Sequence, residues 1–257
     1  MCVSQIINNQ QKMNPKIIQA AKLLSSSVHV TAFTGAGISV ESGIPPFRGP
    51  KGLWSKYDPK ILDIEYFKTN GSDAWEAINK LFYDFFTSAQ ANAAHKALAK
   101  LEEMGIVKSI ITQNIDNLHQ EAGSKKIWEY HGNYRKLICM KCKMEYEAKT
   151  FDPSEVPLCK NDNSILKPDF VFFGESIPEK ASAASFHEAS VADVFLLVGT
   201  TGEVMPANLV PRLAKQNGAK IIEINPEPSS YTNEITDIFL EGRAGEILPA
   251  LVENIRQ

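Results

Sequence analysis

The 257-residue sequence contains little cysteine, carries no strong net charge and has no long apolar run. Its formal charge of −3 provides no positive field, which disfavours nucleic acid as a direct partner. No apolar run approaches the ~18–20 residues of a membrane-spanning helix, and the segment Met1–Pro15 lacks the basic start and apolar middle of a secretory signal. We therefore expect a cytoplasmic protein that has no membrane partner.

Cysteine occurs at only four positions, 2, 139, 142 and 159. Four cysteines could form two disulfides, but Cys139 and Cys142 make a C-x-x-C pair. In a chain that is not secreted, such a pair indicates metal binding or redox chemistry.

The apolar residues, which make up 44% of the chain, follow two kinds of pattern. Short continuous apolar runs predict buried strands at Val28–Phe33, Val107–Ile111, Val194–Val198 and Lys220–Ile224. Apolar residues at three- and four-residue spacing predict helices at Pro15–Ser25, Ala93–Met104, Asn208–Asn217 and Gly245–Ile255. Buried strands that alternate with helices are typical of α/β proteins, so we predict a Rossmann-like, doubly wound parallel sheet.

Two segments interrupt this alternation. Residues 51–91 contain several aromatic residues and predict a helical insert with a loop, and residues 133–166 hold three cysteines and predict a small module. The prediction is therefore one Rossmann-like domain made of residues 1–50, 92–132 and 167–257, with these small modules inserted.

Polar loops follow the predicted strands, with the sequences TGAGIS, TQNIDNLH, GTTGEV and NPEP. In open α/β sheets ligands bind at the carboxyl ends of the strands, near the point where the strand order reverses. The loops could be turns only, but together they carry Gln, Asn, Asp, Thr and Glu, which favours a binding site. The loop Gly35–Gly37 could admit a pyrophosphate; a tight turn is the alternative, because Val40 replaces the third glycine of G-x-G-x-x-G.

Longer segments resemble the signature of the sirtuin family of NAD-dependent protein-lysine deacylases. They follow the family's order and cover nearly the whole chain from Ala21 onward: GAGISVESGIPPFRG (35–49), GLW (52–54), TQNIDNLHQEAGS (112–124), His131-Gly132, KPDFVFFGE (167–175), GTTGEV (199–204), INP (224–226) and GRAGEILP (242–249). The resemblance implies NAD as the cofactor, and nicotinamide and O-acyl-ADP-ribose as products.

The resemblance also implies which residues bind NAD. The glycine loop would contact the phosphates beneath Arg48, and Phe47 would shield the reactive ribose carbon. Asp116 and the backbone of Ile115 would hold the carboxamide. The full implied set is Gly35, Ala36, Gly37, Phe47, Arg48, Gln113, Asn114, Ile115, Asp116, Gly199, Thr200, Thr201, Asn225, Pro226, Arg243 and Ala244. Two local alternatives stay open: Phe47 could be a core residue, and the polar segment could begin a helix at Asn117.

His131 and Asn114 are the catalytic residues that the resemblance implies. An imidazole titrates near neutrality, as a general base requires, and His131 would take a proton from a ribose hydroxyl. Acylated proteins or peptides are the expected partners, bound as an added strand between two segments. The residues of those segments are Val171, Phe172, Phe173, Gly174, Glu203 and Val204.

The cysteine module departs from the family pattern, in which two C-x-x-C pairs bind a structural zinc ion. Cys139 and Cys142 form the first pair, but the second reads C-K-N-D from Cys159 to Asp162. Carboxylates also bind zinc, so these four residues are a candidate zinc site. A metal-free module is the alternative, because the fourth soft ligand is missing.

A second departure concerns the acyl group. A bacterial branch of the family that removes acidic acyl groups carries a Tyr-x-x-Arg pair in the helix before Asn92. Counting back from His95 without gaps puts Ala77 and Lys80 at those places. We therefore expect acetyl or a longer aliphatic acyl group as the substrate.

Two other activities could use the same cofactor site, protein mono-ADP-ribosyl transfer and NAD hydrolysis. A binding module without catalysis would require a damaged catalytic set, which the sequence does not have. A dehydrogenase is disfavoured because no acidic residue follows the glycine loop at the spacing of ~20 residues, in a second strand, that a dinucleotide fingerprint requires.

Overall fold

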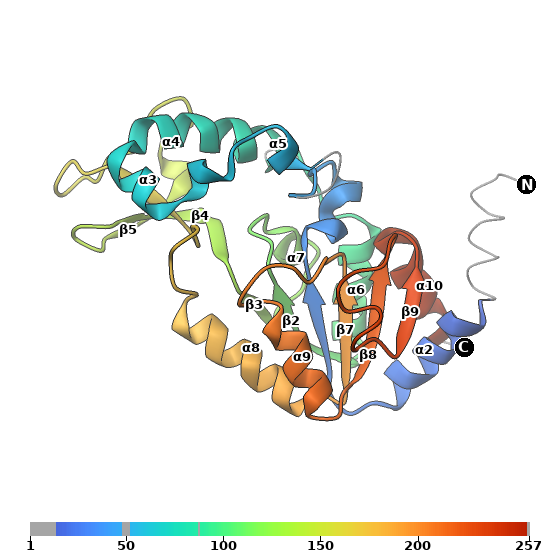
Figure 1. Ribbon diagram of the computed structural model, residues 1–257. Helices are drawn as coiled ribbons and strands as arrows, with labels where there is room; N and C mark the ends of the chain where they lie inside the picture. The colour runs from blue at the N-terminus through green and yellow to red at the C-terminus, as the bar shows by residue number, and fades with distance from the viewer. Residues whose placement is uncertain (1–13, 48–51, 87, 256–257) are drawn as a thin grey trace, which may run out of the picture.

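The main body of the computed structural model, which describes residues 14–47, 52–86 and 88–255, is a six-stranded parallel sheet (Figure 1). The strand order is β3-β2-β1-β7-β8-β9. The strands are β1 (Val30–Thr34), β2 (Val107–Thr112), β3 (Ile127–Glu129), β7 (Val194–Val198), β8 (Lys220–Asn225) and β9 (Ile238–Glu241). Along the chain, β2 and β3 are added on one side of β1, and β7, β8 and β9 are then added on its other side. The strand order therefore reverses between β1 and β7.

The register brings the ends of the central strands to one level. Thr34 of β1 pairs with both Thr112 of β2 and Val198 of β7, and Val198 in turn pairs with Ile224 of β8. The loops that follow these four strands consequently begin side by side at one edge of the sheet.

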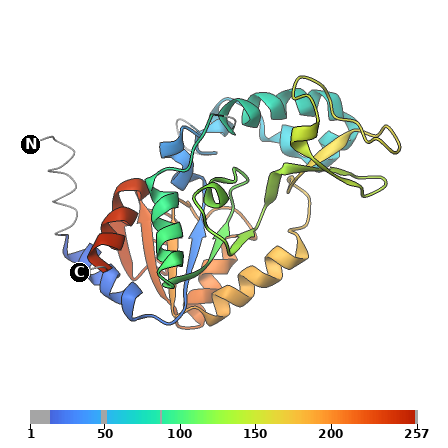
Figure 2. The same cartoon turned by 180° about the vertical axis from the view of Figure 1, so that it is seen from behind.

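Helices cover both faces of the sheet (Figures 1 and 2). Those on one face are α2 (Pro15–Ser26), α6 (Ala93–Glu103) and α10 (Ala244–Ile255), and those on the other are α8 (Glu179–Val191) and α9 (Leu209–Gln216). Side chains of β1 enter both cores: Val30 and Ala32 pack with α2, α6 and α10, whereas Phe33 packs with α8 and α9. Burial on both faces is the reason why the strands are continuously apolar.

The four predicted strands and the four predicted helices are all present, with ends that differ by at most two residues. The predicted α/β class with a doubly wound parallel sheet is confirmed. Helix α8 was not predicted, because alanine, serine and charged residues leave it without a clear apolar stripe. The edge strands β3 and β9 have three and four residues, too few for a periodic pattern.

A second, smaller part of the molecule lies beyond the carboxyl edge of the sheet (Figure 1). Its antiparallel sheet has the order β5-β4-β6, formed by β4 (Gly132–Cys139), β5 (Glu145–Glu147) and β6 (Leu166–Phe170). Its helical elements are 3-10 helices at Leu53–Ser55, Pro59–Leu62 and Ala148–Thr150, α3 (Ile64–Thr69), α4 (Gly71–Ile78), a π-helical segment at Asn79–Tyr83 and α5 (Asp84–Phe86).

The helical insert and the cysteine module share one apolar cluster, although the main-domain segment 92–132 separates them in sequence. Trp75 of α4 is fully buried in this cluster, and its indole N–H donates a 2.7 Å hydrogen bond to the carbonyl of Leu166 in β6. The two inserts therefore pack as one unit, and the exact division of the chain into domains stays a prediction. No helix in the described part of the chain combines the length and apolar composition that crossing a membrane requires.

We expect Trp75→Phe to lower the free energy of unfolding by about 1–3 kcal/mol, because it leaves the buried Leu166 carbonyl without its donor. Urea unfolding followed by tyrosine fluorescence and circular dichroism measures this loss. Trp128→Phe is the matched control, since the buried Trp128 Nε1 has no partner among the described residues. Equal effects of the two substitutions would show that the hydrogen bond does not join the modules.

Candidate active site

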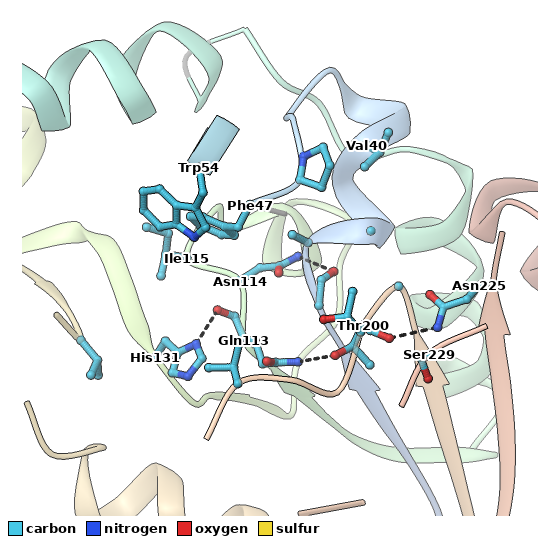
Figure 3. A pocket seen from close by; sticks show the side chains of 18 of the residues that line it. Val40, Phe47, Trp54, Gln113, Asn114, Ile115, His131, Thr200, Asn225 and Ser229 are labelled. Carbon is cyan, nitrogen blue, oxygen red and sulfur yellow. Dashed lines mark hydrogen bonds between the residues drawn. The ribbon is translucent and has the colours of Figure 1, made fainter. Parts of the chain in front are cut away.

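A cavity of about 980 Å³ lies between the loops that follow β1, β2, β7 and β8 and the small part of the molecule (Figure 3). It gathers most of the site residues predicted from the sequence. These are Gly35, Ala36, Gly37, Phe47, Gln113, Asn114, Ile115, His131, Val171, Phe172, Phe173, Gly174, Gly199, Thr200, Thr201, Val204, Asn225, Pro226, Arg243 and Ala244. Arg48 lies outside the described residues, and neither Asp116 nor Glu203 lines the cavity.

The loops after β1 and β7 touch backbone to backbone. A Cβ atom on Gly37 would lie 2.6 Å from the Cα atom of Gly199, and one on Gly199, where φ is +63°, would lie 2.4 Å from the nitrogen of Ile38. The Gly37 N–H donates to the Gly199 carbonyl at 2.9 Å, and the Gly35 N–H donates to the last residue of β7. The two glycines thus serve loop packing. The N–H of Ala36, which begins the 3-10 helix Ala36–Ser42, donates to no described residue and remains able to meet an anion.

Thr200 connects the loops after β2 and β8. Its hydroxyl accepts a 3.1 Å hydrogen bond from the Gln113 side chain, and its carbonyl accepts one of 3.0 Å from the side chain of Asn225 (Figure 3). Three polar side chains that are far apart in the sequence are therefore fixed relative to one another at the cavity wall.

Asn114 and Asp116 belong to a buried polar cluster around Ser39. The Asn114 amide donates to the Gly35 carbonyl and to Ser39 Oγ, each at 3.2 Å, and Ser39 Oγ donates to Asp116 at 2.6 Å. Asp116 also accepts from the N–H of Leu118, the first residue of α7 (Leu118–Glu121). Burial raises the pKa of Asp116, and these hydrogen bonds oppose the rise. The segment thus begins a helix as well as contributing Asn114 to the cavity.

His131 lies in the link between β3 and β4, at the cavity wall. Its Nδ1 is 3.1 Å from the carbonyl of Gln113, which can only accept, so Nδ1 carries the proton (Figure 3). Nε2 is then the basic nitrogen of the neutral ring. Burial lowers the pKa of His131 below its ordinary value of 6.5, against a smaller opposite effect of the Gln113 carbonyl. The ring is consequently neutral at pH 7 and able to accept a proton.

Aromatic and aliphatic side chains form the part of the cavity that faces the small domain. The rings of Phe47 and Trp54 lie 5.5 Å apart and those of Phe47 and Phe82 6.4 Å apart, measured between centroids. Leu62 and Ile115 belong to the same wall. Phe47 therefore lines the cavity and also packs on the core of the small domain. The interpretation as a cavity residue and the interpretation as a core residue are thus compatible.

Several cavity residues were not predicted as site residues. Leu62, Ile177 and Ser229 carry no local signal, because apolar or small residues outside a motif look like ordinary core or loop. Trp54 stands inside the GLW segment that resembles the family signature, and this segment could have identified it.

The segment after β6 is held from two sides. The Val171 N–H donates to the His131 carbonyl at 2.9 Å, and Phe173 pairs with the chain at Leu62 and Ile64. The buried Lys167 ammonium contacts Glu175 at 3.0 Å, while burial lowers its pKa. Phe173 is nevertheless 45% exposed, so its side chain is accessible at the mouth of the cavity.

The cysteine module brings three thiols and one carboxylate together. Ligand atoms of Cys139, Cys142, Cys159 and Asp162 all lie within 4.8 Å of one another. The two sequence pairs form matching turns, each closed by a residue with positive φ, Lys143 after the first and Asn163 after the second. Asp162 therefore occupies the place in its turn that Cys142 occupies in the other.

The chemistry of this donor set fits a tetrahedral zinc ion. Hydrogen bonds from the backbone and hydroxyl of Ser164 lower the pKa of Asp162 to about 2, so its carboxylate is ionised at neutral pH. The described thiols are free, and no disulfide competes with metal binding. The geometry thus favours the predicted Cys₃Asp site over a metal-free module.

Three features are typical of one class of α/β enzymes, which bind a nucleotide beside a small metal-binding module. They are the reversal of the strand order between β1 and β7, the polar cavity at this point, and the cysteine module. The sequence profile of the Sir2 family matches residues 35–206. The chain belongs to the Sir2, or sirtuin, family.

Relatives and solved structures agree with this assignment. The chain is 47% identical over 250 residues to the NAD-dependent protein deacylase of Pyrococcus furiosus, and the alignment covers 93% of this chain and 98% of the relative. It is 46% identical over 241 residues to NAD-dependent protein deacylase 2 of Pyrobaculum aerophilum, and this alignment covers 93% of this chain and 96% of the relative. A Sir2 enzyme structure that is 44% identical superimposes with a TM-score of 0.88 over 95% of this chain and 99% of the other.

We expect the purified protein to contain about one zinc ion per chain, measured by inductively coupled plasma mass spectrometry. Asp162→Ala should weaken zinc binding by removing a ligand, and Asp162→Cys should restore it with a softer one. Glu155→Ala, at an exposed carboxylate of the same module, should leave the zinc content unchanged. Full zinc occupancy in Asp162→Ala under chelator competition would rule out Asp162 as a ligand.

Proposed function

We propose that this chain is an NAD-dependent protein deacylase that removes acyl groups from protein lysine and releases nicotinamide and O-acyl-ADP-ribose. One observation carries the proposal: the basic Nε2 of His131 belongs to a cavity that has polar nucleotide-type loops on one side and an apolar wall on the other. That cavity provides a base between a place for a dinucleotide and a place for an acyl chain.

The donors and acceptors of the polar side fit NAD. The unpaired N–H of Ala36 suits a pyrophosphate, and Asn225 and Ser229 suit the hydroxyls of the adenosine ribose. Ile115 and Asn114 also line the cavity, and by the family resemblance they would meet the nicotinamide end. These assignments rest on the geometry of the loops together with the family resemblance.

When bound, NAD supplies an electrophilic ribose carbon and the hydroxyl that receives the acyl group. The residues of the chain bind the NAD, exclude water from it and accept a proton from it. The neutral His131 accepts the hydroxyl proton at Nε2, while the Gln113 carbonyl keeps the ring in the required tautomer. Phe47 and Trp54 keep water from the reactive carbon with an apolar cover.

The apolar wall supports aliphatic acyl groups as substrates. Among the described residues that line the cavity, Arg243 is the one permanent cation, and it lies at the adenosine side, next to Gly242, whose N–H bonds to Asn225. Lys80 does not line the cavity; it is mostly exposed and pairs with Glu76 at 2.6 Å. A carboxylate at the end of an acyl chain would therefore be buried without a cation. A relative that is 38% identical, with a TM-score of 0.79 over 95% of this chain and 98% of its own, has been solved with a myristoylated histone peptide.

An acylated peptide would bind as an added strand. Val171–Phe173 form one edge and Glu203–Met205 the other, and Met205 is 62% exposed, as a residue that contacts a partner would be. Acylated proteins or peptides are therefore the proposed partners.

Mass spectrometry of acyl-lysine peptides with and without NAD tests the function. We expect NAD-dependent loss of the acyl group, with O-acyl-ADP-ribose as a product, and a fall on the order of 10³ or more for His131→Ala because the base is lost. Consumption of NAD with no loss of acyl groups would instead indicate NAD hydrolysis, and label that remains on protein would indicate ADP-ribosyl transfer.

The pH dependence provides a separate check on His131. Because the base must be neutral and burial lowers its pKa, kcat/KM should rise with pH through an apparent pKa below 6.5 and be level near pH 7. A limb centred clearly above 6.5 would contradict the tautomer and burial described for this ring.

The apolar wall of the cavity also predicts which acyl groups the enzyme prefers. We expect kcat/KM for succinyl-lysine to be on the order of 10² or more below that for butyryl-lysine, because an unpaired buried carboxylate costs several kcal/mol. Lys80→Ala should leave the ranking of the acyl groups unchanged. Comparable rates for the two peptides, with succinyl activity lost in Lys80→Ala, would reverse this conclusion.

A further inference from the structure

Glu223 is a buried negative charge in the middle of an apolar strand. It lies in β8, its exposed fraction is 0%, and its partners among the described residues are all neutral donors. Asn225 and the hydroxyls of Ser229, Thr232 and Thr236 donate to it at 2.5–3.1 Å. No cation pairs with Glu223 in the described part of the chain, so its charge is solvated by hydrogen bonds but not cancelled.

Two of these donors, Asn225 and Ser229, also line the polar side of the cavity (Figure 3). Because both donate to Glu223, the charge lies one side chain behind the cavity wall. The hydrogen bonds of the loop after β8 thus converge on a single carboxylate.

The same contacts fix the orientation of the Asn225 amide. Its Nδ2 donates to the Thr200 carbonyl and to the Glu223 carboxylate, each at 3.0 Å, and both groups only accept. Both hydrogens are therefore used, and the Oδ1 atom accepts from no described residue. The asparagine presents an acceptor to its ligand, which suits a hydroxyl that donates.

We propose that Glu223 makes this site selective for NAD over NADP. The inference rests on the proposed function, in which the adenosine ribose lies at Asn225. A free 2′-hydroxyl donates to Asn225 Oδ1, whereas a 2′-phosphate has no proton to donate and brings negative charge toward a carboxylate that is shielded from water. A charge behind a low-dielectric wall acts over several ångströms with little screening.

Other charges at this side of the cavity are exposed. Glu227 opposes a phosphate and Arg243 attracts one, and water and salt screen both side chains. Glu223 differs from them because solvent does not reach it. Its contribution is therefore the one that persists at physiological ionic strength.

Isothermal titration calorimetry with NAD and NADP tests the proposal in the full chain. We expect the wild type to bind NAD at least about tenfold more tightly than NADP. Glu223→Gln should reduce that ratio by about tenfold, chiefly by tighter NADP binding, because the hydroxyls of Thr232 and Thr236 can turn to accept from the new amide and hold the loop. Thr236→Val removes one donor but keeps the charge, and it should leave the ratio unchanged.

The outcomes distinguish an effect of the Glu223 charge from a structural effect of the substitution on the site. Weaker binding of both nucleotides by one common factor in Glu223→Gln, or an equal affinity of the wild type for NAD and NADP, overturns the proposal while leaving the deacylase function intact. Failure of the wild type to bind either nucleotide overturns the proposed function as well.

A ligand-side experiment needs no variant and holds even where Glu223→Gln does not fold. NAD with a 2′-O-methyl group also lacks the donated proton but carries no added charge. We expect the wild type to bind it more tightly than NADP. Equal or weaker binding of the methylated nucleotide would show that size or the lost hydrogen bond, and not the buried charge, excludes NADP.

Discussion

The direct backbone contact between Gly37 and Gly199 is the constraint on which the site depends. No side chain fits between these loops, and the hydrogen bond from Gly37 to Gly199 joins them at the point where the strand order reverses. The Ala36 N–H, next to this contact, donates to no described residue. The same glycine contact sets the position of Thr200, which connects the side chains of Gln113 and Asn225. The polar side of the cavity is thus built outward from a single glycine contact.

The second half of the site comes from a different source. The helical insert and the cysteine module form one apolar unit around Trp75, and this unit presents Phe47, Trp54 and Phe82 to the cavity. The same unit contains the four candidate zinc ligands of the cysteine module. Between the two halves stands His131, fixed by a carbonyl that belongs to the sheet domain. In the proposed function, the sheet domain would therefore bind the nucleotide, and the small unit would shape the acyl site.

Much of this arrangement could be predicted from the sequence, for physical reasons. Strands buried on both faces are continuously apolar, so β1, β2, β7 and β8 are visible without a structure. The polar loops at their ends mark the site because parallel strands end at one edge. The pairing of Asp162 with three cysteines also follows from spacing, since the two turns are alike.

Other features depend on contacts that no local pattern encodes. The apolar wall is made by residues such as Leu62 and Ile177, which resemble ordinary core. Asp116 stands in the strongest motif, yet it points into a buried cluster with Ser39 instead of lining the cavity. Glu223 interrupts an apolar strand in a way that gives no hint of its four partners, because Ser229, Thr232 and Thr236 reach it only through the fold of the following loop.

The most direct test of the account is a crystal structure of the chain with an unreactive NAD analogue and an acetyl-lysine peptide. The account predicts the pyrophosphate at the Ala36 N–H, the adenosine ribose at Asn225, and His131 Nε2 within hydrogen-bond distance of a hydroxyl on the nicotinamide-side ribose, with the acyl chain against Phe47 and Trp54. A nucleotide bound outside the cleft between the β1 and β7 loops, or a His131 Nε2 turned away from the ribose, would contradict it.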